Sequence, residues 1–192
     1  MTSELIFVFI TAAIINNFVF KYFLGICPFL GVSKRVDMAV GMGFAVTFVM
    51  TVAGSLTWLI YNLVLVKLNI VFLQYITFIL VIAGAVQLVE MYIRKFFPSL
   101  YESFGIFLPM ITTNCAILGA CLFIQKFDYN FVEALVFSIG GGLGFALSIT
   151  IMAGIREELD FADVPEYFKG PGITLIIASI LAMAFSGFLI KR

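Results

Sequence analysis

The sequence predicts an all-α, polytopic membrane protein, because it is strongly apolar, poorly charged and divided into long apolar runs. Of its 192 residues, 63% are apolar and 11% are charged, and the mean hydropathy is +1.17. Soluble domains are about half apolar and about a quarter charged. Helices are expected because an open strand edge in lipid leaves backbone groups without hydrogen bonds. Lys plus Arg and Asp plus Glu balance at 11 each, so nothing in the charge predicts binding to nucleic acid.

The apolar runs predict six transmembrane helices, since about 20 residues cross the hydrocarbon core. These spans are expected at residues 4–30, 36–65, 70–93, 100–125, 131–153 and 171–190. The connections are too short for a second domain, so residues 1–192 are predicted to form a single integral membrane domain. Residues 1–4 lack the positive segment of a signal peptide, so the first run is expected to be retained as a span.

Basic residues in the connections predict the orientation. One side of the membrane would carry Lys34, Arg35, Arg94, Lys95, Arg156 and Lys169, and the other Lys67, Lys126, Lys191 and Arg192. Because cytoplasmic loops are richer in Lys and Arg, the first set is predicted to be cytoplasmic and both termini outside. The longest connection, residues 156–172, contains an acidic stretch at 157–166, which we interpret as a cytoplasmic docking surface for a partner protein.

Two short patterns occur once in each half of the chain. Residues 41–46 (Gly-Met-Gly-Phe-Ala-Val) resemble residues 142–147 (Gly-Leu-Gly-Phe-Ala-Leu), and residues 24–27 (Leu-Gly-Ile-Cys) resemble residues 118–121 (Leu-Gly-Ala-Cys). Three spans separate the halves, so matching segments would cross the membrane in opposite directions. This predicts two inverted three-helix repeats, about 1–95 and 96–192, with broken helices near the midplane. Chance is the alternative, since small residues at this spacing are common in membrane helices.

Three cysteines and the absence of histidine direct attention to thiolate chemistry. A transition-metal site here would be built mainly from thiolates, which favours iron, iron–sulfur or structural zinc. Cys27 precedes Pro28, and Cys115 follows Pro109 and a polar Thr-Thr-Asn run, so both lie where a helix is expected to break. Cys115 and Cys121 would point roughly 120° apart on one helix. The repeat favours Cys121 as the counterpart of Cys27, the helix break favours Cys115, and inert packing is the alternative for each thiol.

Polar side chains lie beside both of these cysteines. Asn17, Thr113 and Asn114 are candidates to donate hydrogen bonds to a thiolate or sulfide, which would raise the potential of a metal cluster. They could equally form hydrogen bonds with the backbone groups that lose their helical partners at the breaks. Lys21, within the first span, suits either an ion path or a snorkelling or capping role.

Longer motifs resemble a known family along the whole chain. They are residues 15–19 (Ile-Asn-Asn-Phe-Val), residues 24–34 around Cys27, residues 105–116 ending at Cys115-Ala116, and Ile-Arg-Glu at 155–157 with Ala-Asp-Val-Pro at 162–165. Together they resemble the RnfA family of membrane subunits of Rnf electron-transport complexes. The related NqrE family is similar but differs at two places. It has Glu-Asn where this chain has Asn-Asn at positions 16–17, and Cys-Thr-Phe-Leu-Ala where this chain has Cys-Pro-Phe-Leu-Gly at positions 27–31.

The resemblance implies a membrane subunit of an ion-translocating ferredoxin:NAD⁺ oxidoreductase. The sequence has no Gly-x-Gly-x-x-Gly motif that opens a helix after a strand and no phosphate loop, so no nucleotide site is expected in this chain. It implies pairing with the homologous RnfE subunit, of opposite orientation, and with other Rnf subunits. Each of the two homologues would supply two cysteines to one [2Fe–2S] cluster, and the matching positions here are Cys27 and Cys115. Electron relay would be coupled to transport of Na⁺ or H⁺, and Cys121 would serve packing. The alternatives are an NqrE-type subunit of a Na⁺-pumping NADH:quinone reductase, or a secondary transporter built from inverted repeats.

Overall fold

A computed structural model describes residues 2–68, 71–96, 108–159, 161 and 170–187. All regular secondary structure in these residues is helical, which confirms the predicted all-α class. Three helices are long and apolar enough to cross a membrane: Val36–Leu65, Gln74–Met91 and Phe131–Leu159. Shorter apolar helices, Glu4–Ile15, Met110–Lys126 and Pro171–Ser186, occur where the first, fourth and sixth spans are predicted. The count of six spans and the inverted repeat stay predictions.

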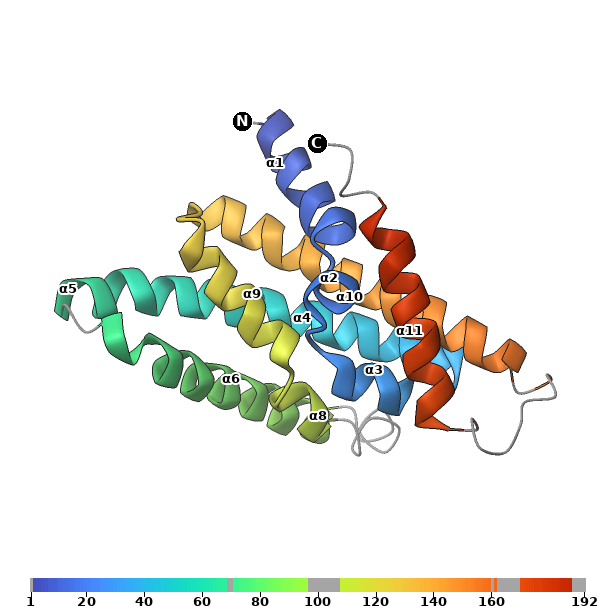
Figure 1. The fold of residues 1–192 in the computed structure, drawn as a ribbon. Helices are drawn as coiled ribbons and strands as arrows, with labels where there is room; N and C mark the ends of the chain where they lie inside the picture. Colours follow the sequence, from blue (N-terminus) through green and yellow to red (C-terminus); the bar gives the residue numbers. More distant parts are fainter. Residues whose placement is uncertain (1, 69–70, 97–107, 160, 162–169, 188–192) are drawn as a thin grey trace.

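Two long antiparallel helices, α4 (Val36–Ile60) and α10 (Phe131–Leu159), form the centre of the fold (Figure 1). Gly43 of α4 lies against Ala146 of α10, where an added Cβ would come 2.5 Å from the alanine Cβ. Both residues belong to the two similar patterns at 41–46 and 142–147. These small residues therefore let the backbones approach closely, as small residues do in membrane helix pairs.

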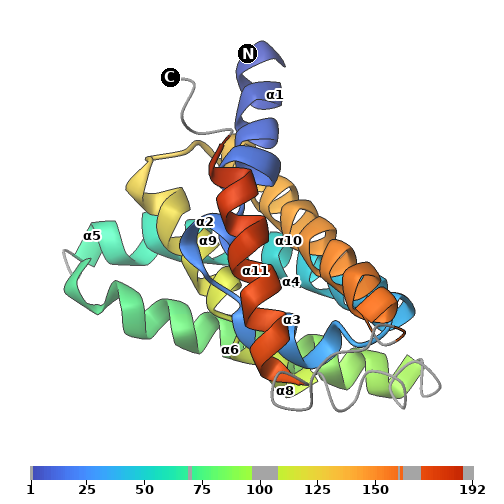
Figure 2. The same ribbon diagram turned by 45° about the vertical axis from the view of Figure 1, so that its right-hand side comes forward.

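The remaining helices surround this pair (Figures 1 and 2). In chain order they are α1 (Thr2–Ile10), the π-helix η1 (Thr11–Ile15), α2 (Phe18–Tyr22), α3 (Ile26–Val32), the π-helix η2 (Tyr61–Leu65), α5 (Val66–Leu68), the 3₁₀ turn η3 (Val71–Leu73), α6 (Gln74–Phe96), α8 (Leu108–Thr112), α9 (Cys115–Lys126) and α11 (Pro171–Ser186). α6 and α9 pack on α4, while α1 and η1 pack on α10.

The first apolar run is interrupted twice. The chain leaves the helix at Asn16–Asn17 and again between Tyr22 and Ile26, where Phe23 and Gly25 adopt left-handed φ angles of 56° and 81°. Pro28 itself lies in the first turn of α3. Its missing N–H is therefore one of the groups that have no intrahelical partner, and the proline does not interrupt α3. The sequence pattern predicts an interruption here, and the structure places it before Cys27.

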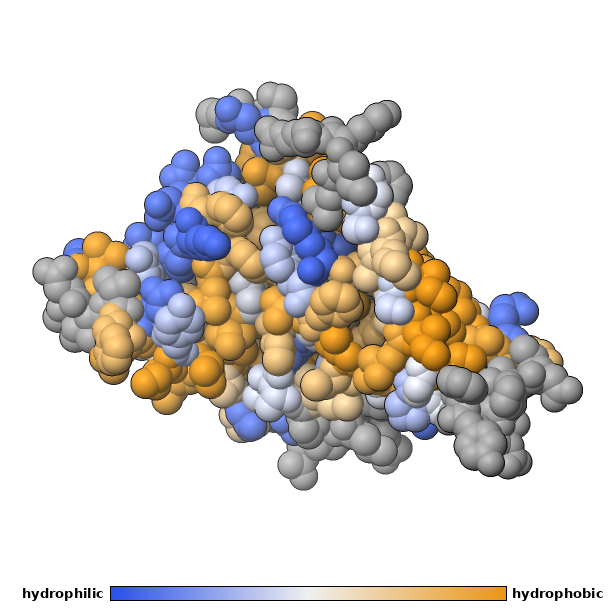
Figure 3. Space-filling view, viewed as in Figure 1, coloured by the Kyte–Doolittle hydropathy of each residue, from blue (hydrophilic) through white to orange (hydrophobic). Residues whose placement is uncertain are grey.

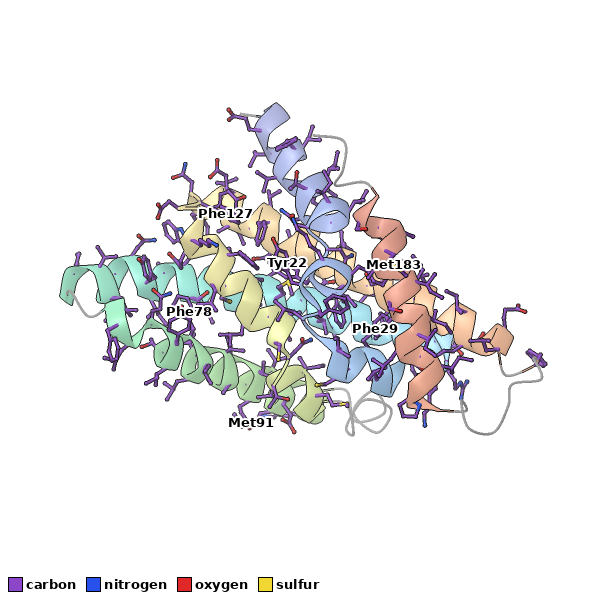
Figure 4. The ribbon with its side chains drawn as sticks, in the orientation of Figure 1. Tyr22, Phe29, Phe78, Met91, Phe127 and Met183 are labelled. Carbon is purple, nitrogen blue, oxygen red and sulfur yellow. The ribbon has the colours of Figure 1, made fainter. Side chains whose placement is uncertain are left out.

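Aromatic rings hold the five-residue helix α2 between α9 and α11. The Tyr22 ring lies 4.8 Å from that of Phe123 on α9, and the Phe20 ring lies 4.6 Å from that of Phe185 on α11, measured between centroids. Figure 4 shows Tyr22 between these two helices. A helix this short has little stability of its own, so these contacts fix the position of α2.

The two ends of the bundle are each closed by a long-range hydrogen bond. At one end, Trp58 Nε1 donates to the Tyr129 carbonyl at 2.9 Å. At the other, Val36 N donates to Glu157 Oε1 at 3.0 Å. The connection after α9 and the connection after α3 therefore lie at opposite ends, as alternating spans require. Which end faces the cytoplasm stays a prediction.

The predicted connection at residues 156–172 begins later than expected. α10 continues to Leu159, so Arg156, Glu157 and Glu158 belong to its last turns and not to a loop. A helix can continue past its apolar run because its backbone groups remain hydrogen-bonded whatever the polarity of the side chains. Residues 160 and 162–166 of the predicted acidic docking stretch lie outside the described residues.

The outer surface is rich in large apolar side chains, and Figure 3 shows apolar surface over α11. Phe44 is 66% exposed, Leu80 is 71% exposed and Met183 is 65% exposed. Surfaces of this kind are covered by lipid or by other membrane proteins, which agrees with the sequence prediction of a membrane protein.

Candidate metal centre

The structure separates the three thiols into two classes. Cys27 is the second residue of α3 and Cys115 is the first residue of α9, and both side chains are exposed. Cys121, two turns further along α9, is fully buried beside Thr57 of α4. Only the two thiols at helix starts are therefore accessible to a ligand or a partner.

The turn before Cys27 lies directly against the segment that contains Cys115. A Cβ added to Gly25 would come 3.1 Å from Asn114 Oδ1 and 3.2 Å from Ala116 Cβ. The next residue back, Leu24, contacts α9 at Gly119, where an added Cβ would lie 2.6 Å from Leu24 Cδ1. The two helix breaks therefore meet, although residues 24 and 114 are far apart in the sequence. This contact places the break that precedes Cys27 beside the break that precedes Cys115, and the pairing of the two thiols stays a prediction.

Gly25 is a residue of this site that sequence reasoning missed. Its φ of +81° is a conformation that side chains rarely adopt, and the Phe145 ring lies 2.8 Å from the position of a Cβ. A glycine two residues before a cysteine, in a run expected to break, was the available signal. Its pairing with Asn114 and Ala116 depends on tertiary packing and is not visible in the sequence.

The two asparagines have different roles. Asn17 caps α2, because its Oδ1 accepts from Val19 N at 3.0 Å and from Phe20 N at 3.4 Å. Its Nδ2 donates to the Gly144 and Ala13 carbonyls at 2.9 and 3.3 Å. Asn17 is thus committed to backbone groups freed by the break, which is the structural alternative for this residue.

Asn114 caps α9 but keeps one donor without a partner. Its Oδ1 accepts from Ala116 N at 2.9 Å, while its Nδ2 is buried and has no hydrogen-bond partner among the described residues. The whole side chain is 3% exposed. A buried amide left without a partner costs about 1–3 kcal/mol, so an acceptor supplied at this site would stabilise the folded chain. Next to it, Cys115 Sγ lies 4.0 Å from the Thr113 carbonyl oxygen.

Lys21 belongs to α2, and its ammonium group is turned back toward the break at Asn16–Asn17. Its ammonium group donates to Asn16 Oδ1 and lies 5.3 Å from the centroid of the Tyr22 ring. Both contacts are with neighbouring side chains, and the two roles predicted for Lys21, an ion path and a snorkelling or capping role, both stay predictions.

The two exposed thiols fit part of the donor set of a thiolate-bound iron–sulfur group. Clusters of this type are held by cysteine thiolates, usually four of them. This chain presents two exposed thiols from contacting segments, and the described residues contain no group of three or more His, Cys, Asp or Glu that could hold a metal ion. A cleft of about 560 Å³ opens beside Cys115, between α9 and the residues Tyr61, Gln74 and Tyr75.

Comparison with known proteins supports the resemblance seen in the motifs. The family described as "Rnf-Nqr subunit, membrane protein" matches residues 5–191. The A-type subunit of an ion-translocating oxidoreductase complex from Syntrophotalea carbinolica is 53% identical over 186 residues, covering 97% of this chain and 96% of that protein.

Two further relatives agree. The A-type subunit of a Na⁺-translocating ferredoxin:NAD⁺ oxidoreductase complex from Acetobacterium woodii is 52% identical over 184 residues, covering 96% of each chain. The A-type subunit of an ion-translocating oxidoreductase complex from Serratia proteamaculans is 48% identical over 186 residues, covering 97% of this chain and 96% of that protein. With a family match over nearly its whole length and relatives near half identity, this chain belongs to the Rnf-Nqr family of membrane-protein subunits.

Proposed function

We propose that this chain is a membrane subunit of an Rnf-type ion-translocating ferredoxin:NAD⁺ oxidoreductase and relays electrons through an iron–sulfur cluster. The observation that carries the proposal is the contact between two helix breaks, each of which leads into a helix with an exposed cysteine in its first turn. The names of the relatives support the type of complex.

The cluster would be [2Fe–2S], held by Cys27 and Cys115 from this chain and by two thiolates from the homologous RnfE subunit. When bound, it supplies one-electron transfer. The chain's own contribution is to place two thiolates in the first turns of α3 and α9, whose starting segments are in contact. The N-terminus of α9 adds a favourable partial positive charge beside Cys115, because the first amide groups of a helix favour an anionic group.

Asn114 is the residue best suited to tune such a cluster. Asn114 directly precedes Cys115, and its Nδ2 has no hydrogen-bond partner among the described residues. A hydrogen bond donated to a ligating sulfur or to a sulfide raises the reduction potential of a cluster. Thr113 stays a weaker candidate. Asn17 is fully engaged with the backbone, so we assign it to the stability of the break.

In the cell, we propose that the chain lies in the cytoplasmic membrane of a bacterium or archaeon, with both termini outside and the connection at residues 33–37 inside. It would assemble with the other Rnf subunits, and the complex would couple electron flow to the movement of Na⁺ or H⁺. A reporter that is active only outside the cytoplasm, fused to Arg192, should be active. Activity at the same position of a reporter that works only in the cytoplasm would contradict this orientation.

The test of function is metal analysis of this chain co-expressed and purified with its homologous partner. We expect iron and sulfide in equal amounts and an electron paramagnetic resonance (EPR) signal on reduction. Cys27→Ala and Cys115→Ala should each abolish the signal, because an open coordination position destroys a four-thiolate site. Cys121→Ala is the matched control and should retain it.

Two results would overturn the proposal. One is a purified pair that contains no iron and transports a solute alone, as expected of a secondary transporter. The other is loss of the cluster in Cys121→Ala while Cys115→Ala retains it, which would return the second ligand to the position favoured by the internal repeat.

A further inference from the structure

The seven-residue helix α3 carries Cys27, so whatever holds α3 also sets the position of this thiol. A helix of this length is not stable by itself. It is preceded by a break and followed at once by the connection to α4. Its orientation must therefore come from contacts with other parts of the chain.

Arg156 of α10 holds the C-terminal end of α3. Its Nη1 donates to the Leu30 carbonyl at 3.0 Å and to Ser33 Oγ at 2.9 Å. Ser33 is fully buried, and the arginine is partly buried. A cation at this end satisfies carbonyl groups that have no intrahelical donor and interacts favourably with the helix dipole.

The next residue of α10 holds the start of α4. Glu157 Oε1 accepts a hydrogen bond from Val36 N at 3.0 Å, and the residue at the N-cap position, Arg35, makes no capping hydrogen bond with its own side chain. Adjacent residues of one helix thus bind the two sides of the α3–α4 connection. Arginine suits the carbonyl end of α3 and glutamate suits the amide end of α4.

α3 and the turn before it also contact the segment that leads to Cys115. A Cβ added to Gly31 would come 2.9 Å from Met110 Cε on α8, and Gly25 lies against Asn114. α3 is therefore in contact both with the end of α10 and with the α8–α9 segment. Removing the hydrogen bonds from α10 would allow α3 to tilt against the segment of Cys115.

We propose that Arg156 and Glu157 are positioning residues that fix α3, and through it the thiol of Cys27, relative to Cys115. Neither residue is proposed to touch the cluster. The consequence for the cluster rests on the proposed function, but the geometry of the two thiols can be tested without iron.

The first test measures cross-linking of Cys27 to Cys115 in the full-length chain, expressed without its partner and treated with a short bismaleimide. Cys121→Ser serves as the background. Arg156→Ala should lower the rate of cross-linking several-fold, and Arg156→Lys should give an intermediate rate because it keeps the charge but not both hydrogen bonds. Arg35→Ala is the matched control, since Arg35 is exposed at the same connection and its ion pair among the described residues is with the exposed Asp37, at 3.4 Å.

The second test measures the EPR signal and midpoint potential of the co-purified pair. Arg156→Ala should broaden the signal and shift the potential, Arg156→Lys should restore part of the change, and Arg35→Ala should match the parent protein. If Arg156→Ala prevents insertion, Ser33→Ala, which removes only one acceptor, should show the same changes to a smaller degree.

The inference is overturned if Arg156→Ala cross-links at the parent rate. If Arg156→Ala does not insert, it is overturned when Arg156→Lys and Ser33→Ala both cross-link at the parent rate. A parent chain in which the two thiols do not cross-link would also overturn it. A parent pair without iron would contradict the proposed function instead, and the cross-linking result would still decide the role of Arg156.

Discussion

The α4–α10 pair and the broken segments around Cys27 and Cys115 treat polar groups in opposite ways. On the long helices, hydroxyl groups donate to carbonyls of their own helix: Thr47 to Gly43 at 2.7 Å, and Ser138 to Ala134 at 2.8 Å. These carbonyls also accept the regular helical hydrogen bond, so each hydroxyl group is hydrogen-bonded within its own helix and links no distant segment. The long helices are joined instead by close contact of small residues.

In the broken segments, polar side chains are needed. Asn17 and Asn114 each cap the helix that follows them, and Asn17 also reaches the Gly144 carbonyl of α10. Unpaired backbone groups are costly inside a membrane, and these two side chains satisfy amides at the starts of α2 and α9. The break before α3 instead turns at Gly25, which has no side-chain cap. The difference indicates that the intact helices supply a rigid frame, while two of the breaks lead into helices whose first turns carry the exposed thiols of Cys27 and Cys115.

The comparison is tested most strongly by enlarging a glycine at the α4–α10 crossing. A Cβ on Gly142 would lie 2.6 Å from Thr47 Cα, which belongs to the backbone and cannot rotate away. Gly142→Val should therefore destabilise the chain by about 3 kcal/mol, as overpacking does.

The buried Cys121 thiol is a convenient probe once the exposed Cys27 and Cys115 are replaced by serine, since burial should protect it from maleimide until the chain unfolds. Its labelling should begin at a lower temperature in Gly142→Val. Gly154→Val on the same helix is the control, because no atom lies within 4 Å of an added Cβ. Equal labelling curves for the two variants would show that the crossing is not tightly packed.

Asn17→Ala should have the next largest effect. It removes the α2 cap and the donor to the Gly144 carbonyl in a buried position, at a cost of about 2 kcal/mol. The labelling assay on Cys121 measures this, and Asn16→Ala is the neighbouring control. If both variants unfold at the same temperature, the capping role of Asn17 is wrong.

Asn114→Ala should cost less stability than Asn17→Ala, about 1 kcal/mol, because one cap is lost while a buried donor without a partner is also removed. Its larger effect is expected on the cluster. Loss of a donor near a ligating sulfur should lower the midpoint potential of the co-purified pair, measured by EPR-monitored redox titration. A potential identical to that of the parent would limit Asn114 to the capping role.

The smallest effect is expected from Thr47→Val. The hydroxyl bonds only to its own helix, and valine preserves the shape that packs against Gly142. Stability should change by no more than about 0.5 kcal/mol. A loss comparable to that of Asn17→Ala in the same assay would mean that hydroxyl groups also stabilise the intact helices, and the contrast between the two regions would fail.

Hydropathy and spacing were sufficient to predict the helical class, the positions of the apolar helices and the two interrupted segments beside Cys27 and Cys115. These properties are local, because the length of an apolar run and the presence of Pro, Gly and Asn act within a few residues. The motifs around the same cysteines were also sufficient to indicate the family that the comparisons confirm.

Only the tertiary structure decided which thiols are exposed, that Gly25 lies against Asn114, that Asn17 is committed to α10 and that α10 extends to hold α3 through Arg156. The last three of these facts each join residues that are far apart in the sequence. Helix periodicity gives the relative direction of two side chains on one helix, but it does not give which neighbouring helix they face. Close packing of α4 on α10 selects one arrangement, and that arrangement brings the two breaks together.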